Sequence, residues 1–362
     1  MSIKLGMISL GCAKNLVDGE HMLAQLADAG VTIVDDVAEA DVAVVNTCGF
    51  IESAKQEAIN TILETAQLKQ TGSLKALIVT GCLVQRYPKE IVEELPEIDA
   101  VLGTGSYTNI VDAVRAVMQA PGTVYQNFGQ INEAEMEGGR ILLTPGYSAY
   151  LKIAEGCDNH CAYCVIPSLR GKFRSRAMED VLKEAQALAD AGVRELIIVA
   201  QDITRYGTDL NGEHQLAALL RELCKLDFHW IRLHYLYPDD ITDELIDTIA
   251  AEPKICKYID MPIQHCNDTI LKAMNRRDTK AELLDAIAGS EGRVLACETI
   301  GLTPPLLVDV TNAEYAASLS ADILLLNMFD VQHPVINALP KVPELETVRE
   351  LKRLTGRVVG IN

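Results

Sequence analysis

Short apolar runs alternate with amphipathic stretches through the first 118 residues. Three runs rich in β-branched residues, within 4–12, 40–48 and 74–82, are predicted to be strands. The stretches that follow them carry apolar residues at three- and four-residue spacing, which is typical of helices. Because strands that alternate with helices of this length pair in parallel, we expect an open parallel α/β sheet domain over residues 1–118.

The pattern changes at residue 119. Residues 119–147 are acidic and rich in turn-forming residues, so we expect a linker with little structure of its own. Alternation then resumes, which predicts a second parallel α/β unit, a partial barrel, over 148–288. Its predicted strands lie within 149–157, 193–202, 229–238 and 257–265, and its predicted helices within 179–192 and 216–226.

Composition narrows the class of protein. The chain has 362 residues, of which 49% are hydrophobic and 23% charged, as in a globular protein with room for two domains. No apolar run approaches the roughly 18 residues that span a bilayer, and the first residues lack the pattern of a secretory leader. We therefore expect a cytoplasmic protein with no membrane partner. The 51 acidic residues outnumber the 32 basic ones, which makes nucleic acid an unlikely partner.

Three of the ten cysteines lie on one short loop. Cys157, Cys161 and Cys164 follow a predicted strand directly, and thiolates at this spacing can converge on an iron–sulfur or zinc centre. With three sulfurs, a 4Fe–4S cube keeps one iron open to a small molecule. His160 could instead complete a structural zinc site, but its side chain is adjacent to Cys161, and neighbouring side chains rarely point at one ion.

A second set of three cysteines is dispersed along the first domain. Cys12, Cys48 and Cys82 each end one of the three predicted strands. Since the carboxyl ends of parallel strands share one edge of a sheet, we expect the three thiols to meet there and bind a second cluster. A glycine beside each (Gly11, Gly49, Gly81) would allow close backbone approach to a bulky centre. The alternative is that they are ordinary buried thiols.

The loop with Cys157, Cys161, Tyr163 and Cys164 resembles the signature loop of radical S-adenosylmethionine (SAM) enzymes. This resemblance implies that the open iron binds SAM, which is cleaved to a deoxyadenosyl radical. It also implies that Tyr163 packs near the adenine, although Tyr163 could simply cover one side of the loop. In related enzymes the end of the second strand contacts the amino group of SAM, which favours Gln201 and Asp202 as cofactor-binding residues; an ordinary structural hydrogen bond is the alternative.

Two such cysteine sets in two α/β domains are typical of the methylthiotransferases, and residues 4–288 resemble the RimO family throughout. The segments that carry this resemblance are SLGCAKNLVDGE, NTCGFIESAKQEAI, EGCDNHCAYCVIPSLRGKFRSR and DMPIQHCNDTILKAMNRR. The resemblance implies two 4Fe–4S clusters, SAM as cofactor, and transfer of a methylthio group to the β-carbon of an aspartate in small-subunit ribosomal protein 12. It also implies an electron donor such as flavodoxin or ferredoxin. Transfer-RNA methylthiotransferases share both cysteine patterns and remain an alternative.

Further polar residues are candidates to line the cavity. His234, Gln264 and His265 lie at the ends of later predicted strands. A basic run just after the cysteine loop could meet carboxylates of cofactor or substrate, or could be an ordinary solvated face. Its members are Arg170, Lys172, Arg174 and Arg176.

The resemblance stops near residue 289. Residues 289–362 still alternate between predicted strands and helices, but we recognise in them neither the further barrel strands nor the terminal TRAM domain that the family implies. This α/β tail suggests a truncated or chimeric reading frame. A third hypothesis follows, that the chain is an inactive iron–sulfur protein whose altered C-terminus cannot complete the SAM pocket.

Overall fold

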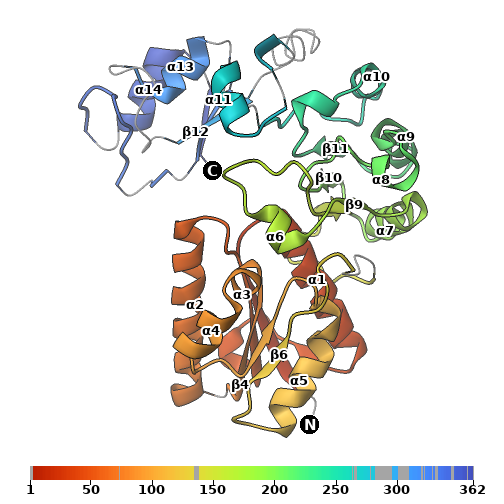
Figure 1. The fold of residues 1–362 in the computed structure, drawn as a ribbon, viewed down its shortest axis with the longest axis vertical. Helices are drawn as coiled ribbons and strands as arrows, with labels where there is room; N and C mark the ends of the chain where they lie inside the picture. The colour runs from red at the N-terminus through yellow and green to blue at the C-terminus, as the bar shows by residue number, and fades with distance from the viewer. Residues whose placement is uncertain are drawn as a thin grey trace.

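Three α/β units follow one another along the chain in the computed structural model of the protein (Figure 1). Among the described residues, no helix is both long enough and apolar enough to cross a membrane. The structure describes residues 3–72, 74–133, 138–262, 264, 267–277, 279–281, 296–300, 310–318, 321, 323–327, 329–330, 333–343, 346–356 and 358–361.

The N-terminal domain is built on a six-stranded sheet in which every neighbouring pair is parallel, in the order β2-β1-β3-β4-β5-β6. This confirms the predicted open parallel sheet. All six residues of β3 and all six of β4 are buried, because helices cover both faces of the sheet. The strands are β1 (Lys4–Ser9), β2 (Thr32–Ile33), β3 (Val42–Thr47), β4 (Ala76–Gly81), β5 (Ala100–Leu102) and β6 (Tyr125–Asn127).

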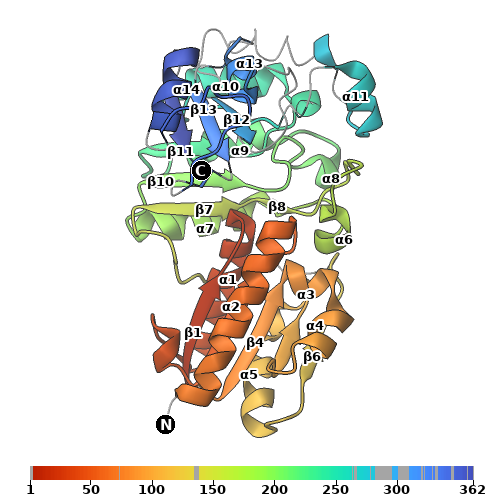
Figure 2. The same ribbon diagram turned by 90° about the vertical axis from the view of Figure 1, so that its left-hand side faces the viewer.

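The helices of this domain divide between the two faces of the sheet. α1 (Ala13–Asp28) and α5 (Ile110–Gln119) pack on one face, where Leu23 and Val114 join the core. α2 (Glu52–Thr71), α3 (Cys82–Arg86) and α4 (Pro88–Glu94) cover the other. The short helices η1 (Val37–Glu39) and η2 (Tyr107–Asn109) complete the domain. Figure 2 shows the sheet with its strands running toward the second domain.

The segment 119–147 has more structure than the predicted linker. Strand β6 pairs with β5 at the edge of the first sheet, so the prediction is wrong over 125–127. Arg140 in the same segment is buried and pairs with Glu20 of α1 and with Glu184 of the second domain. The sequence cue was misleading because a three-residue edge strand carries too little periodicity to be recognised.

The second domain contains the three-stranded parallel sheet β11-β10-β7. Its core lies between the sheet and helices α7, α9 and α10, as a partial α/β barrel requires. The strands are β7 (Ser148–Lys152), β8 (Ala154–Glu155), β9 (Arg174–Ser175), β10 (Glu195–Val199) and β11 (Trp230–Leu233). The helices are α6 (Ile166–Arg170), α7 (Met178–Asp190), α8 (Thr208–Asn211), α9 (Leu216–Leu223), η3 (Pro238–Asp240), α10 (Asp243–Ala251) and α11 (Asp268–Ala273).

The strand predicted within 257–265 is not a strand where the structure describes it. Next to this region Ile255 forms only an isolated bridge with Ile231 of β11, and residues 258–262 have no regular structure. The apolar run there also contains Pro262, which cannot donate to a strand ladder.

The third unit lies in the predicted α/β tail. Its parallel sheet has the order β12-β13-β14, and residues such as Leu324 and Leu351 form a small separate core. The strands are β12 (Ala296–Ile300), β13 (Ile323–Asn327) and β14 (Val358–Ile361), and the helices are α13 (Asn312–Ser318) and α14 (Thr347–Thr355). The predicted alternation is therefore present in this tail.

Candidate metal centres

The three dispersed cysteines lie at the carboxyl ends of adjacent strands. Because β1, β3 and β4 are neighbours in the sheet, the residues that follow them share one edge. Cys12 caps the N-terminus of α1, Cys48 follows β3, and Cys82 is the first residue of α3 after β4. The predicted gathering of these thiols at the edge of the sheet is present in the structure.

The glycines beside them allow the three turns to lie against each other. Gly11 has a φ of +89°, and a Cβ on it would stand 2.6 Å from Cβ and 3.1 Å from Sγ of Cys48. Gly81 has a φ of +100°, and a Cβ there would stand 2.4 Å from the carbonyl oxygen of Thr47. The sequence suggested that glycine makes room for a metal centre; in the structure it first makes room for the neighbouring cysteine turn.

The three thiols are close enough to influence one another electrostatically. Burial raises the pKa of Cys82 to about 11, and the neighbouring Cys12 and Cys48 also raise it. Burial raises the pKa of Cys48 as well. At Cys12 burial alone would raise the pKa, but Lys14 and Arg170 together with backbone N–H groups lower it below its ordinary value. The trio therefore has one thiol already biased toward the thiolate that binds metal.

The second trio lies on the loop after β8. The backbone N–H of Cys157 donates to the carbonyl oxygen of Gly171 at 3.1 Å. Gly156 has a φ of +79° and lies close to the backbone of Lys172. A Cβ added to Gly156 would stand 2.1 Å from the carbonyl oxygen of Lys172. Burial raises the pKa of Cys157 to about 11, with smaller contributions from Cys164 and Cys161. The loop is thus held on one side by the turn that follows α6.

The segment after α11 holds the same loop from its other side. The N–H of Ala162 donates to the carbonyl oxygen of Met274 at 2.9 Å. The side-chain amide of Asn275 donates to the carbonyl oxygen of His160 at 2.8 Å. This contact joins residues 115 positions apart in the sequence. This large separation in the sequence explains why the segment after α11 could not be predicted to lie beside the cysteines.

Two side chains near Cys161 were not predicted. The hydroxyl of Tyr237 lies 3.2 Å from Sγ of Cys161, and the Arg276 guanidinium lies 4.1 Å from the centre of the Tyr237 ring. Tyr163 itself is 49% exposed, and burial together with Cys161 raises its pKa to about 12. Packing of Tyr163 near an adenine therefore stays a prediction, while Tyr237 is a contact that only the fold reveals.

The arrangement of the two trios does not suit a single metal ion. Among the residues that the structure describes, no three His, Cys, Asp or Glu side chains are arranged to hold one metal ion. His160 is exposed, so the zinc alternative is not supported. A cube makes a different demand, since each thiolate binds its own iron and the sulfurs need only lie around one pocket. The thiols of each trio lie near enough to raise one another's pKa, and a cube at each site stays a prediction.

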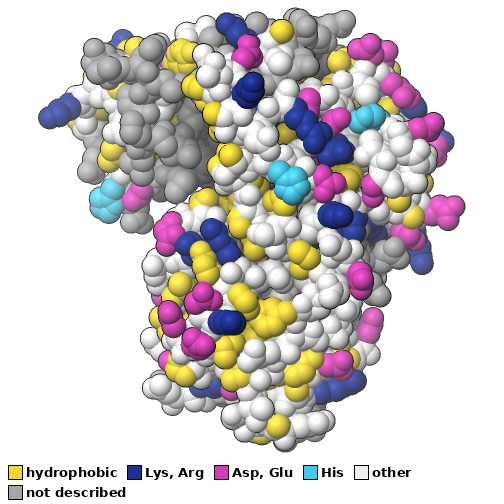
Figure 3. Space-filling view, viewed as in Figure 1, with side chains coloured by type: hydrophobic (Ala, Val, Ile, Leu, Met, Phe, Trp, Pro, Cys, Tyr) yellow, Lys and Arg dark blue, Asp and Glu magenta, His cyan; other side chains and the backbone are white. Residues whose placement is uncertain are grey.

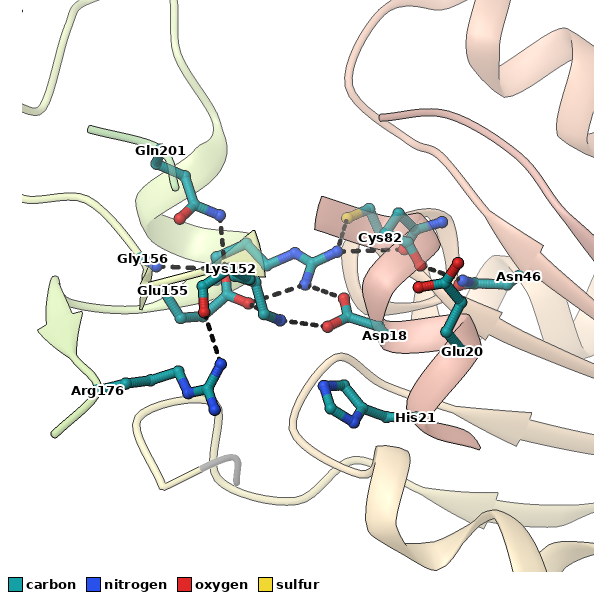
Figure 4. A network of polar contacts seen from close by, with 12 residues as sticks. Asp18, Glu20, His21, Asn46, Cys82, Lys152, Glu155, Gly156, Arg176 and Gln201 are labelled. Atoms are coloured by element: carbon teal, nitrogen blue, oxygen red, sulfur yellow. Dashed lines mark hydrogen bonds and ion pairs between the residues drawn. The ribbon is translucent and has the colours of Figure 1, made fainter. Parts of the chain in front are cut away.

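A buried charge network joins the two cysteine-bearing domains (Figure 4). Asp18 of α1 pairs with Lys152 of β7 and with Arg170 of α6, and both cations also pair with Glu155. The four side chains are 3–5% exposed. Burial alone would raise the pKa of Glu155, but Lys152 and Arg170 lower it well below its ordinary value. The acidic and basic charges therefore balance within the interface.

Arg170 also reaches the first trio directly. Its guanidinium donates to Sγ of Cys82 at 3.4 Å and to the side-chain oxygen of Asn15 at 3.1 Å. The predicted basic run is therefore not one surface. Arg170 and Arg176 are buried, Arg176 pairs with Glu184, and Lys172 is exposed. On the face drawn in Figure 3, Lys and Arg side chains are interspersed with Asp and Glu.

Gln201 and Asp202 lie at the carboxyl end of β10 as expected. The amide of Gln201 donates to Glu155 at 2.5 Å. Asp202 is fully buried, accepts from the amide of Asn159 in the cysteine loop at 3.1 Å, and has a pKa that burial raises to about 6. Their role toward SAM stays a prediction. Of the later candidates, His234 is half-buried and Gln264 exposed, while His265 lies outside the described residues.

Three family models match parts of the chain. Residues 4–103 match "Uncharacterized protein family UPF0004", 151–289 match "Radical SAM superfamily", and 265–362 match "Domain of unknown function (DUF7916)". The third match confirms the prediction that the C-terminal region departs from the family of the rest. Each cysteine trio lies inside one of the first two matched regions.

Curated relatives match the first two regions together. The chain is 53% identical over 290 residues to the ribosomal protein uS12 methylthiotransferase RimO of Clostridioides difficile, covering 79% of this chain and 64% of the relative. It is 53% identical over 287 residues to the enzyme of that name from Geobacter sulfurreducens, with coverages of 79% and 64%. The chain thus spans about 64% of the length of these relatives.

Among solved structures, the fold resembles the radical S-adenosylmethionine methyltransferase TsrM from Kitasatospora setae bound to tryptophan and a SAM analogue. The TM-score is 0.63 at 15% identity, over 90% of this chain and 73% of that one. At this identity the likeness concerns the fold alone. The chain therefore carries a UPF0004 domain followed by a radical SAM domain, and over these two domains it is similar to the uS12 methylthiotransferases RimO.

Proposed function

We propose that the protein is a radical SAM methylthiotransferase that adds a methylthio group to the β-carbon of an aspartate in ribosomal protein uS12. One observation carries the proposal. Two thiol trios lie in two domains that are joined by a buried ion network, in a chain about half identical to RimO enzymes over both domains. A carbon–hydrogen bond is too unreactive for acid–base side chains, so the reaction needs what these thiols can hold.

The residues that would hold the two clusters are the six predicted cysteines. Cys12, Cys48 and Cys82, the first trio, would bind a 4Fe–4S cube in the N-terminal domain, and Cys157, Cys161 and Cys164, the second trio, would bind another in the radical SAM domain. When bound, such cubes supply an electron for reductive cleavage of SAM and a free iron that can carry the sulfur to be transferred. The N-terminal sheet edge would present that sulfur toward the radical SAM domain.

The protein's own side chains would orient and shield these centres. Arg170 would donate to the thiolate of Cys82, and Tyr237 to that of Cys161. Gln201 and Asp202 would contact the amino group of SAM, and Tyr163 its adenine. Because Arg170, Glu155 and Lys152 fill the interface, bulk water is kept away from the region between the domains.

The partners follow from the same reaction. A second molecule of SAM would provide the methyl group, and a reduced flavodoxin or ferredoxin would provide electrons in the cytoplasm. The formal charge of −19 would attract a basic ribosomal protein by long-range steering. The same charge disfavours transfer RNA, the substrate of the related enzymes.

The test is anaerobic reconstitution of the full chain, followed by incubation with SAM, a reductant and a peptide that carries the modified loop of uS12. We expect about eight irons per chain, formation of deoxyadenosine, and a peptide heavier by one methylthio group. Cys161→Ala should abolish deoxyadenosine formation. Cys48→Ala should keep it and lose the peptide product. Modification of transfer RNA instead of the peptide would overturn the choice of substrate.

One observation favours a second candidate, an inactive iron–sulfur protein. Residues 265–362 match a domain family other than the radical SAM superfamily, and this region begins inside the radical SAM match. If the altered region prevents closure around SAM, the reconstituted protein will hold iron but form no deoxyadenosine. The same experiment therefore separates the two candidates.

A further inference from the structure

A lysine beside the first cysteine trio is buried between the two domains. Lys14 is the second residue of α1, two positions after Cys12, and is 8% exposed. Its ammonium lies 3.6 Å from the centre of the ring of Tyr235, which follows β11 of the radical SAM domain. The side chain therefore extends from the N-terminal sheet edge to the strand ends of the other domain.

Within the described part of the chain, the structure pairs no carboxylate with this ammonium. The other buried cations of the interface differ in this respect: Arg140, Lys152 and Arg170 each pair with two carboxylates. The ammonium lowers the pKa of the neighbouring Cys12 thiol, and the Tyr235 ring offsets only part of the cost of burying the charge. Lys14 is thus left with the capacity to bind an anion.

The ring of Tyr235 is held in place by its own backbone. Tyr235 has a φ of +67°, which is unfavourable for a residue with a side chain. Its N–H donates to the carboxylate of Asp260 at 3.2 Å, and its carbonyl oxygen accepts from the N–H of Ile203 at 3.1 Å. Positive-φ residues kept by such contacts are concentrated at ligand sites. The ring can therefore hold the ammonium in position without neutralising it.

We propose that Lys14 is the residue that binds the side-chain carboxylate of the substrate aspartate. This inference rests on the proposed function, because it assumes that the substrate carbon lies between the two thiol trios. The carbon must meet the radical formed on one side and the sulfur held on the other. Lys14 lies two residues from Cys12 and contacts Tyr235 of the radical SAM domain. Its ammonium is therefore placed to bind a carboxylate attached to that substrate carbon. An asparagine in place of the aspartate would leave the buried ammonium uncompensated.

The experiment measures the affinity of the reconstituted full chain for two fluorescent uS12 loop peptides, one with the target aspartate and one with asparagine there. We expect the wild-type protein to prefer the aspartate peptide by about 10- to 100-fold, the range of a hydrogen bond to a charged group. Lys14→Met should reduce this ratio to about one. Lys14→Arg should restore part of it, since it keeps the charge with a different shape.

Lys75→Met is the matched control. Lys75 lies just before β4, at the opposite end of the sheet, where it pairs with Asp41 and its side chain is 61% exposed. This variant should keep the preference of the wild type. Circular dichroism spectra show whether the Lys14 variants are folded like the wild type, and iron content and deoxyadenosine formation in the absence of peptide are measured for all four proteins.

The outcomes separate the inference from the proposed function. If the wild type binds neither peptide, the proposed substrate is wrong and the inference is overturned with it. If the wild type binds both peptides equally but still modifies the aspartate peptide, only the inference is overturned. If the wild type discriminates and Lys14→Met still does, only the inference is overturned. The carboxylate of SAM is another anion that Lys14 can bind. If Lys14 binds it, Lys14→Met will lose deoxyadenosine formation but keep its preference for the aspartate peptide, which also overturns the inference.

Discussion

The Arg170 guanidinium donates a hydrogen bond to Sγ of Cys82, 3.4 Å away and in the other domain. The same side chain pairs with Asp18 and Glu155, so its position is fixed from three directions. A hydrogen bond to a thiolate that binds a cluster stabilises the extra negative charge that the cluster gains on reduction. One residue of the radical SAM domain would thus influence the cluster proposed for the N-terminal domain.

We predict that Arg170→Gln lowers the reduction potential of the cluster on Cys12, Cys48 and Cys82. The reduced cluster loses a positive charge and a donor, so its reduction becomes less favourable. The measurement is a redox titration followed by electron paramagnetic resonance, in a Cys161→Ala background that removes the other cluster. Arg115→Gln is the control, because Arg115 is 61% exposed on α5. An unchanged potential with full iron content would contradict the prediction.

We predict that Asp18→Asn destabilises the contact between the two domains. Lys152 and Arg170 would then share Glu155 as their one carboxylate partner in the network, and breaking a buried ion pair on one side costs about 3–5 kcal/mol. Urea unfolding followed by circular dichroism gives the free energy of unfolding. Asp112→Asn removes an exposed carboxylate and should change it by less than about 0.5 kcal/mol. Equal decreases in the free energy of unfolding of the two variants would show that the buried network stabilises the protein no more than an exposed carboxylate does.

We predict that Gly11→Ala prevents assembly of the first trio. The added methyl would stand 2.6 Å from Cβ of Cys48, so the cysteine turns must separate. Gly30→Ala is the matched control, because Gly30 also has a positive φ but a Cβ added to it would meet no atom within 4 Å. Both variants carry the backbone cost of about 1–2 kcal/mol. Iron analysis should find about four irons per chain in Gly11→Ala and about eight in Gly30→Ala.

We predict a loss of stability in mild acid that depends on His21. Burial is the main cause that lowers the pKa of His21 to about 4, from the ordinary value of 6.5. Between these values the unfolded chain binds a proton that the folded chain does not, so stability falls as the pH drops from 6.5 to 4. The loss should amount to about 3 kcal/mol.

The measurement compares urea unfolding of the wild type and His21→Gln at pH 7 and pH 4. Carboxylates remote from His21 titrate alike in both proteins, so the difference between them reports His21 together with its neighbour Glu184, whose pKa His21 helps to lower. The wild type should lose about 3 kcal/mol more than the variant. Parallel losses would mean that the imidazole is protonated in the folded protein.

The sequence by itself determined the parts of this protein that depend on local pattern. Periodicity predicted the strands that end at Cys12, Cys48 and Cys82, and the rule that parallel strands share an edge was enough to bring these thiols together. The loop of Cys157, Cys161 and Cys164 is local in the sequence. The change of family near residue 289 was visible as the loss of familiar motifs, and a separate family model matches there.

Only the tertiary structure decided which side chains meet across the two domains. Lys14 with Tyr235 and Arg170 with Cys82 are separated by 221 and 88 positions. No periodicity encodes such contacts, because they depend on how two separately folded sheets are oriented. The basic run was misjudged for the same reason: its charges were visible in the sequence, but burial and pairing of Arg170 and Arg176 follow from the packing of one domain on the other.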